Sequence, residues 1–241
     1  MEGILSCDGS LTLFNQEFNQ CYHSLKDGAY TETLHKHILP PILFANALHK
    51  PSLNILDICF GLGYNTFTTI AQYIKMGYQG QIKIFTPEKD RSVFEKILGL
   101  EYPYALRGVN IREIIAMLSA KGQATITPHI SLELFLGDAR EYLQSFEPQS
   151  IDIIYQDAFS PKANPELWSL EYFSELFKIT HLSVIITTYS THQATLARAQ
   201  KAGFLVYKYA SSYTRKSTLL CKQALPQSPS IQIWNQNRID V

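Results

Sequence analysis

A carboxylate and a proline-rich loop follow an apolar stretch in the middle of this chain, and they carry its strongest chemical signal. The stretch Ile151–Tyr155 is apolar enough to form an interior strand, and Asp157 follows it at the start of a loop stiffened by Pro161 and Pro165. In open α/β sheets, ligands bind at the carboxyl ends of the strands. Asp157 is therefore a candidate catalytic group, although it could instead cap the helix expected to begin near Asn164.

A glycine-rich turn follows the first apolar strand, expected over residues 53–58. Glycines suit such a turn because it needs backbone angles that other residues resist, and because a cofactor must approach the backbone closely. Close packing alone could also explain them. The candidate cofactor-binding residues of this turn are Asp57, Phe60, Gly61, Gly63 and Asn65.

Acidic residues follow the next two strands. Glu88 lies near the spacing from the turn at which an acidic side chain of a Rossmann-type fold binds the hydroxyls of an adenosine ribose, and Asp90 could do so instead. Asp138 could accept a hydrogen bond from an adenine amine while it caps the following helix. Close packing could explain any one of these features, but it explains much less readily why the glycine turn, Glu88, Asp138 and Asp157 all occur at successive strand ends. The candidate cofactor-binding residues here are Glu88, Lys89, Asp138 and Ala139.

The turn fits S-adenosylmethionine better than a dinucleotide. A dinucleotide-binding G-x-G-x-x-G sequence would place its third glycine at position 66, which is occupied by Thr66. S-adenosylmethionine has no phosphate, and it needs the backbone turn, an acid for the ribose and a polar contact for the adenine. The sequence therefore favours methyl transfer, with a dinucleotide-dependent oxidoreductase as a weaker alternative.

The elements that position these residues alternate between strands and helices. Strands are expected at 53–58, 81–86, 131–136, 152–155, 182–188, 204–209 and 217–222, and helices at 64–76, 91–98, 111–121, 139–142, 166–178 and 193–201. This order predicts an α/β fold with a doubly wound, mostly parallel sheet and an antiparallel edge strand. Combined with the expected cofactor, it corresponds to a Rossmann-like class I S-adenosylmethionine-dependent methyltransferase. No arrangement is predicted for the rest of the irregular region 99–129.

The two ends of the chain lie outside this alternation. Short alternating segments flank Asp8-Gly9 and predict a small N-terminal β element. Helical spacing over Thr33–Leu48 is interrupted at Pro40-Pro41, which predicts a helix that stops and restarts. The expected organisation is an N-terminal β-hairpin and helical extension over 1–50, a methyltransferase domain over 51–223 and an extended C-terminal tail over 224–241.

Composition limits the class of protein. The chain has 241 residues, 46% of them hydrophobic, and fits one large α/β domain. No run approaches the roughly 18 uncharged apolar residues of a membrane helix, and the N-terminus lacks the pattern of a secretory signal, so we expect a cytoplasmic protein without a membrane partner. The cysteines show no spacing typical of zinc sites or disulfides, and we expect no metal. They are Cys7, Cys21, Cys59 and Cys221.

The formal net charge of zero conceals an asymmetry. No Asp or Glu occurs from Leu176 to Ile239, whereas this segment contains Lys178, Arg198, Lys201, Lys208, Arg215, Lys216, Lys222 and Arg238. Such a region can attract a polyanion such as RNA by neutralising phosphates and releasing counterions. The same charges could instead be scattered over several solvated faces.

From about Tyr22 to Lys222 the chain resembles the methyltransferase domain of MnmC, including its stand-alone forms. The loop that ends in Asn-Pro-x-x-Trp is the most specific landmark, and Cys59 and Ala158 stand where the family often has glycine. The matching segments are 22–24, 28–29, Glu32, 60–65, 88–89, 137–138, 157–168, 188–190, 202–204 and 215–216.

This resemblance implies S-adenosylmethionine-dependent N-methylation of the 5-aminomethyl group on the wobble uridine of certain tRNAs, which gives the 5-methylaminomethyl, often 2-thio, form. The expected partner is tRNA. The FAD-dependent oxidase half of the bifunctional members cannot fit in this chain, so a separate enzyme would supply the aminomethyl group. The alternatives are a methyltransferase of the same fold that acts on a small amine, and a non-catalytic module that binds S-adenosylmethionine or RNA.

The proposed reaction gives roles to the remaining candidates. An alkylammonium has no lone pair, so Asp157 is expected to hold the substrate amine in line with the methyl group and to help accept its proton. Phe159 and Tyr189 would form aromatic walls, although both could be ordinary core residues.

Three basic residues are candidates for contacts with RNA phosphates, namely Lys162, Arg215 and Lys216. Lys162 is equally well explained as a solvated loop charge. Tyr22 and Glu32 complete the candidate substrate-binding residues, and His23 is expected to be packed and hydrogen-bonded.

Overall fold

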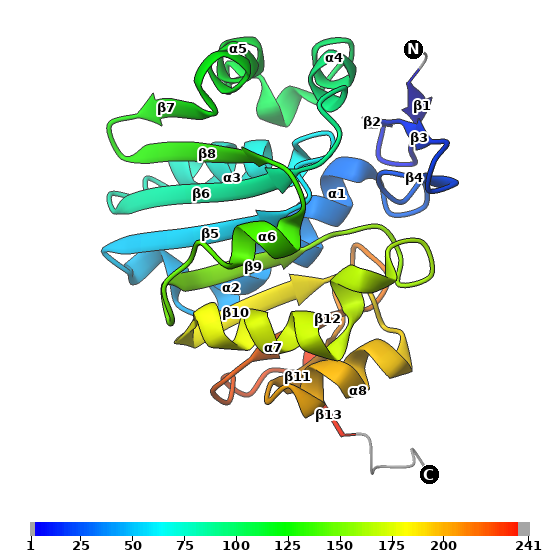
Figure 1. The fold of residues 1–241 in the computed structure, drawn as a ribbon, viewed down its shortest axis with the longest axis vertical. Helices are drawn as coiled ribbons and strands as arrows, with labels where there is room; N and C mark the ends of the chain where they lie inside the picture. The colour runs from blue at the N-terminus through cyan, green and yellow to red at the C-terminus, as the bar shows by residue number, and fades with distance from the viewer. Residues whose placement is uncertain (1–2, 236–241) are drawn as a thin grey trace.

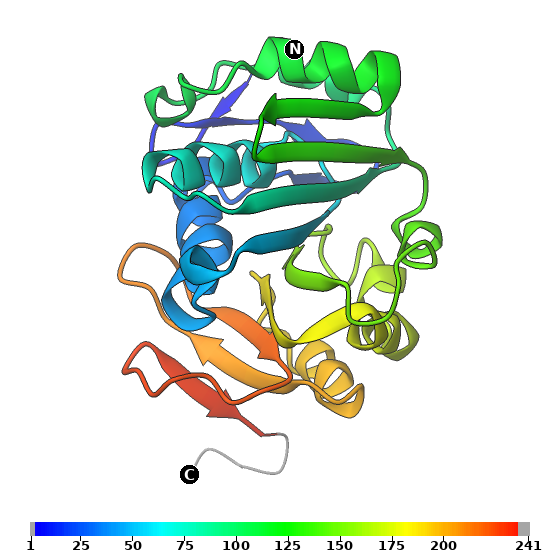
Figure 2. The same ribbon diagram turned by 90° about the vertical axis from the view of Figure 1, so that its left-hand side faces the viewer.

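A sheet with helices on both faces forms the body of the fold (Figures 1 and 2). The computed structural model describes residues 3–235, and its large sheet has the strand order β13-β11-β12-β10-β9-β5-β6-β8-β7. The strands are β5 (Ser52–Ile58), β6 (Gln81–Glu88), β7 (Gln123–Thr127), β8 (Ile130–Leu136), β9 (Ile151–Gln156), β10 (Thr180–Thr188), β11 (Leu205–Tyr209), β12 (Ser217–Cys221) and β13 (Ile231–Trp234).

The centre of this sheet is parallel and both of its edges are antiparallel. Strands β10, β9, β5, β6 and β8 pair in parallel. Apolar side chains fill β9 because helices cover both of its faces. The predicted doubly wound, mostly parallel sheet with an antiparallel edge is therefore confirmed. Strand β7, which pairs antiparallel with β8 at the opposite edge, was not predicted.

The helices form two groups, one on each face of the sheet (Figure 1). One group packs around side chains such as Phe67 and Ile114, and the other around Phe173 and Leu196. The first group is α1 (Ala29–Thr33), α2 (Leu39–Phe44), α3 (Tyr64–Lys75), α4 (Val93–Leu98) and α5 (Ile111–Lys121). The second is α6 (Ala139–Leu143), α7 (Leu170–Ile179) and α8 (Gln193–Lys201).

The structure corrects the prediction of a helix that is interrupted at the paired prolines. Helix α1 begins at Ala29, a π-helical segment occupies Leu34–Ile38, and α2 continues through Pro40 and Pro41. Both prolines lie in the first turn of α2, where a missing N–H is tolerated. The irregularity lies before the prolines because the wider π turn gives their rings room beside the carbonyls of the preceding turn.

Two small hairpins open the described chain and lie near the carboxyl ends of the parallel strands (Figure 1). The predicted hairpin around Asp8-Gly9 is present, with β1 (Ile4–Leu5) paired to β2 (Leu11–Thr12). A second hairpin, β3 (Phe14–Asn15) with β4 (Gln20–Cys21), was not predicted. N-terminal side chains such as Leu13 pack into the same core as β5, so the three-part division of the chain stays a prediction.

The C-terminal segment that the sequence predicts as an extended tail contains a strand. Within it, β13 pairs antiparallel with β11 and adds an edge to the large sheet. Residues 236–241 of that segment lie outside the described part of the chain.

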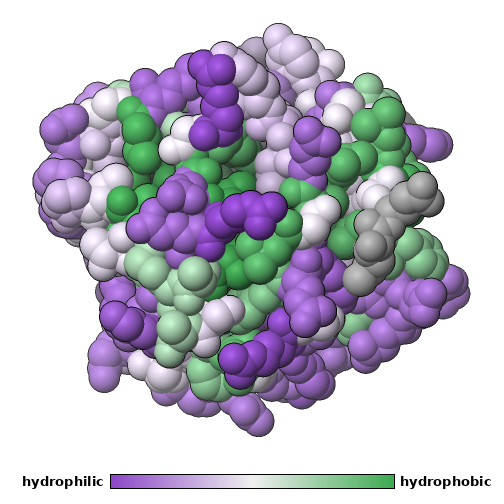
Figure 3. All heavy atoms as spheres, turned by 90° about the horizontal axis from the view of Figure 1, so that it is seen from above, coloured by the Kyte–Doolittle hydropathy of each residue, from purple (hydrophilic) through white to green (hydrophobic). Residues whose placement is uncertain are grey.

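Apolar and polar side chains alternate on the end of the molecule that carries α4 and α5 (Figure 3). The exposed large apolar residues of this part of the chain include Leu98 and Tyr104. Over residues 3–235, no helix is long and apolar enough to cross a membrane.

Candidate functional site

A cavity of about 750 Å³ opens at the carboxyl ends of β5, β6, β8 and β9. Its volume lies within the roughly 300–1,000 Å³ typical of small-molecule sites. The β3–β4 hairpin and Arg215, in the loop between β11 and β12, contribute to its walls. The structure thus places a ligand-sized cavity at the carboxyl ends of the parallel strands, where the sequence predicts one.

Most of the predicted site residues line this cavity. They are Tyr22, Glu32, Phe60, Gly61, Asn65, Glu88, Lys89, Asp138, Ala139, Asp157, Phe159, Tyr189 and Arg215. Asp57 and Gly63 do not line it, because Asp57 is buried beneath the turn and Gly63 packs against Phe67 at the start of α3. Lys162 and Lys216 are exposed on the surface. Fold topology therefore brings together side chains from distant parts of the chain, while their individual roles stay predictions.

The glycine turn combines packing with access to the cavity. Gly61 and Gly63 adopt left-handed backbone angles, with φ of 53° and 74°. A Cβ atom on Gly63 would lie 2.3 Å from the ring of Phe67, so close packing requires this glycine. Gly61 lines the cavity itself. Cys59 also has a left-handed φ, of 68°, and this conformation disfavours a residue with a side chain.

Asp57 acts from beneath the turn and does not line the cavity as the sequence suggested. Its Oδ2 accepts a hydrogen bond from Thr66 Oγ1 at 2.8 Å, and its Oδ1 accepts one from Asn65 Nδ2 at 3.2 Å. Burial raises the pKa of Asp57 to about 7. Asn65 Nδ2 also donates to Asp157 Oδ2 at 2.9 Å. Asp57 therefore orients the amide that holds the candidate catalytic carboxylate.

Replacing Asp57 with Asn is expected to change how stability depends on pH. Because the pKa of Asp57 is raised to about 7 in the folded state, its contribution to stability is complete below pH 3.8 and is lost as the pH rises through 7. The free energy of unfolding of the wild type, relative to that of Asp57→Asn, should therefore fall between pH 4.5 and pH 8. Urea unfolding at several pH values measures this difference, and a difference independent of pH would contradict the assignment.

Glu88 is fixed at the end of β6 by three backbone N–H groups. Its Oε2 accepts from Gly61 N at 2.8 Å, and its Oε1 accepts from Lys89 N and Asp90 N, both at 2.8 Å. Burial raises the pKa of Glu88. A carboxylate has about four acceptor sites, so one remains for a hydroxyl group in the cavity. This geometry suits the expected contact with a ribose.

Asp138 caps a helix and also lines the cavity. Its Oδ1 accepts from Arg140 N at 2.9 Å and so caps α6, and the side chain of Arg140 forms a bidentate pair with the same carboxylate. Hydrogen bonding to Arg140 lowers the pKa of Asp138. The carboxylate is thus an ionised acceptor on the cavity wall, as an adenine amine requires.

Asp157 has a polar neighbour on each side, and 15% of its side chain is exposed. Asn65 donates to Oδ2, and Nε2 of His37 lies 3.5 Å from Oδ1. Burial raises the pKa of Asp157, but its electrostatic interaction with His37 and the hydrogen bond from Asn65 outweigh this effect, and the pKa lies below its ordinary value. The group is therefore an ionised carboxylate at the cavity wall.

Aromatic side chains pack against the loop that carries this carboxylate. Phe159 stacks on Phe18 of the β3–β4 hairpin, with ring centroids 4.5 Å apart, and also contacts Tyr22. Trp168 Nε1 donates to Phe159 O at 2.8 Å, which explains why the loop carries a tryptophan at its end. Tyr189 Oη donates to Ala158 O at 2.9 Å. Phe159 and Tyr189 are thus packed residues that also form cavity walls.

The β3–β4 hairpin is attached to the loop that carries Asp157. Gln20 Nε2 donates to Ser160 Oγ at 2.7 Å, and Gln20 Oε1 accepts from Ser160 N at 3.3 Å. Sequence reasoning missed this hairpin, including Phe18, since its strands are two residues long and no Asp-Gly pair marks its turn. His23 lines the cavity and packs against Tyr64, in agreement with the expected packed role.

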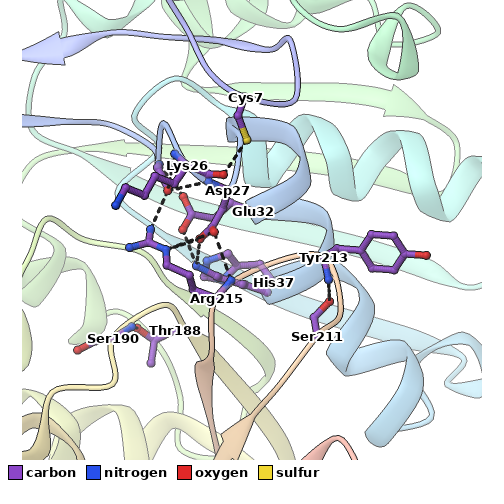
Figure 4. Close-up of polar contacts among 12 residues, drawn as sticks. Cys7, Lys26, Asp27, Glu32, His37, Thr188, Ser190, Ser211, Tyr213 and Arg215 are labelled. Carbon is purple, nitrogen blue, oxygen red and sulfur yellow. Dashed lines mark hydrogen bonds and ion pairs between the residues drawn. The ribbon is translucent and has the colours of Figure 1, made fainter.

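A buried cluster of charges lies beside the cavity (Figure 4). Lys36 Nζ donates to Asp27 Oδ2 and to Glu32 Oε1, both at 2.7 Å. Arg215 Nε donates to Asp27 Oδ2 at 3.1 Å, and Arg215 Nη2 donates to Ser24 Oγ at 2.7 Å. Glu32 therefore holds the cavity wall in place, and Arg215, with 62% of its side chain exposed, has a carboxylate partner at the rim.

Comparison with known proteins agrees with this arrangement. A family model described as S-adenosyl-L-methionine-dependent methyltransferase matches residues 108–224. The crystal structure of MNMC2 from Aquifex aeolicus is similar with a TM-score of 0.79 and 29% identity, covering 95% of this chain and 72% of that chain. The predicted methyltransferase fold and the predicted cofactor, S-adenosylmethionine, are therefore confirmed.

Curated relatives match most of this chain but are longer. An uncharacterized protein of Methanocaldococcus jannaschii is 26% identical over 83% of this chain and 53% of its own length. The bifunctional protein MnmC of Campylobacter concisus, named for tRNA 5-methylaminomethyl-2-thiouridine biosynthesis, is 24% identical over 84% of this chain and 32% of its own length. The chain thus spans about half of the first relative and about a third of the second.

Proposed function

We propose that this chain, an S-adenosylmethionine-dependent methyltransferase related to the methyltransferase domain of MnmC, methylates the 5-aminomethyl group of the wobble uridine in tRNA. The product would be 5-methylaminomethyluridine or its 2-thio form. The observation that carries the proposal is Asp157, an ionised carboxylate that Asn65 holds by a hydrogen bond at the wall of a cavity also lined by Glu88 and Asp138. A separate enzyme would supply the aminomethyl group.

The residues of the cavity fit the methyl donor. Gly61 brings the backbone to the wall, Glu88 retains an acceptor site for ribose hydroxyls, and Asp138 can accept from the adenine amine. When bound, S-adenosylmethionine supplies a methyl group attached to a positively charged sulfur.

Asp157 acts on the substrate amine. An alkylammonium is the main form near neutral pH, and it must lose a proton before its nitrogen can attack. The lowered pKa of Asp157 suits a carboxylate that orients the amine and stabilises positive charge on its nitrogen, and that carries the departing proton only transiently. Phe159 and Tyr189 exclude water around the reacting amine and limit the orientations of the uracil base.

The decisive experiment uses the purified protein, labelled S-adenosylmethionine and tRNA from cells that lack this modification. Digestion of the tRNA to nucleosides should yield labelled 5-methylaminomethyluridine or its 2-thio form. Label in a small amine but not in tRNA would favour the alternative methyltransferase of the same fold. Donor binding without turnover on either acceptor would favour a non-catalytic module.

Neutralising Lys216 is expected to weaken tRNA binding and to flatten its dependence on salt. Lys216 is exposed next to Arg215, which lies on the cavity rim. Loss of one phosphate contact reduces the slope of log K against log salt by about 1. Titrations of labelled tRNA at several salt concentrations measure this slope for Lys216→Gln, with Lys121→Gln at the end of α5 as the control. Equal slopes for both variants would exclude Lys216 from the interface.

A further inference from the structure

A π-helical segment, Leu34–Ile38, brings two consecutive buried side chains to the site. Lys36 and His37 are 2% and 0% exposed. Single π-helical turns within α-helices are frequent at functional sites, because they redirect side chains that a regular helix would place elsewhere. Lys36 contacts the charged cluster described above, whereas His37 faces the loop that carries Asp157.

The two nitrogens of His37 face two different groups. Nδ1 lies 2.8 Å from Thr187 Oγ1, a hydroxyl near the carboxyl end of β10. Nε2 lies 3.5 Å from Asp157 Oδ1, and within the described chain it has no hydrogen-bond partner. A buried polar atom without a partner lowers stability, so stability alone does not explain a histidine at this position. Hydrogen bonds at active sites are often long without substrate and tighten in the complex.

We propose that His37 is a positioning residue for Asp157, an inference that rests on the function proposed above. The Thr187 hydroxyl donates to Nδ1, and this fixes the imidazole tautomer that carries its proton on Nε2. Nε2–H then donates to Asp157 Oδ1 while Asn65 donates to Oδ2. The plane of the carboxylate is set from both sides, and its free lone pairs face the substrate amine. No proton leaves the imidazole in this arrangement.

Two substitutions of His37 separate positioning from packing. The amide nitrogen of Gln can reach the location of imidazole Nε2 and donate to Asp157. The shorter Asn retains contact with Thr187 and cannot reach the carboxylate. His37→Asn should lower kcat for methyl transfer by about 10²-fold, the effect of a displacement near 1 Å, while KM for tRNA and the Kd of S-adenosylmethionine stay unchanged. His37→Gln should recover most of the lost kcat.

Two outcomes of this comparison would overturn the proposal. One is a wild-type kcat in His37→Asn. The other is an equal loss of kcat in His37→Asn and His37→Gln when both variants are folded. Thr187→Val provides a further test, since it keeps the side-chain shape and removes the hydroxyl that fixes the tautomer. It should reduce kcat several-fold, and unchanged kcat would contradict the role given to the hydroxyl.

A spectroscopic measurement tests the same proposal without tRNA. The protein has 7 histidines, and comparison with the spectrum of His37→Asn assigns the ¹⁵N resonances of His37. In the wild type the proton should reside on Nε2, and its resonance should shift in Asp157→Asn. A proton on Nδ1 would refute the positioning role. Absence of tRNA methylation by the wild type would instead count against the proposed function, so the two failures are distinguishable.

Discussion

Asp157→Asn is expected to lower kcat for methyl transfer by about 10²–10⁴-fold, the range typical of a lost acid or base group, while binding of S-adenosylmethionine is retained. The amide has the shape of the carboxylate and can still accept from Asn65, but it has no charge to stabilise a developing ammonium. Single-turnover rates with saturating tRNA measure the chemical step, and calorimetry measures binding of the donor.

A matched control for this variant exists on the same strand. Asp152 lies near the start of β9, 3.0 Å from Lys50 Nζ and at the end of the strand away from the cavity. Asp152→Asn removes the same charge and should leave the rate of methyl transfer close to that of the wild type. Rates in Asp157→Asn that match those of Asp152→Asn would disprove the central role of Asp157.

Lys36→Met is expected to reduce the free energy of unfolding by about 3–5 kcal/mol, the cost typical of breaking a buried ion pair from one side. Asp27 and Glu32 lose the ammonium that lies 2.7 Å from each, and their side chains are only 5% and 10% exposed. Methionine keeps most of the side-chain volume, and Arg215 remains beside Asp27, so the loss reflects mainly the uncompensated charge of Glu32 and not a cavity. Urea unfolding at neutral pH measures the effect.

Lys83→Met serves as the surface counterpart of that variant. Lys83 pairs with Glu133 at 3.3 Å, and the two side chains are 49% and 30% exposed. Exposed pairs of this kind contribute roughly 0–1 kcal/mol. Similar losses of stability in Lys36→Met and Lys83→Met would show that the buried ion pairs contribute no more to the free energy of unfolding than an exposed pair does.

The central part of the fold was predictable because its signals are local. Apolar runs such as Ile151–Tyr155 identify interior strands, and the alternation of strands with helices restricts the topology to few choices. The short strands β3, β4, β7 and β13 were missed because two to five residues carry little pattern and pair only where the rest of the fold provides a partner. The π-helical segment likewise has no distinctive composition.

The site was predictable where chemistry follows from position along a strand. Asp157 and Asp138 follow strand ends and Glu88 is the last residue of its strand, and the parallel topology brings all three to one cavity. His37 could not be found in this way, because its approach to Asp157 depends on how a helix far away in the sequence packs against β10. Asp57 was assigned to the cavity for the opposite reason, since its position at a strand end does not reveal that its side chain points under the turn.

The side-chain amide of Asn65 contacts both the buried Asp57 and the candidate catalytic Asp157, so stability and activity depend on the same group. Its amide has two hydrogens, one directed at Asp57 and the other at Asp157, and its buried Oδ1 has no partner within the described chain. Rotating the amide would therefore remove both donors at once. Any selection for heat tolerance that alters this amide also disturbs the carboxylate that we propose acts on the substrate amine, so laboratory evolution should rarely accept a replacement there.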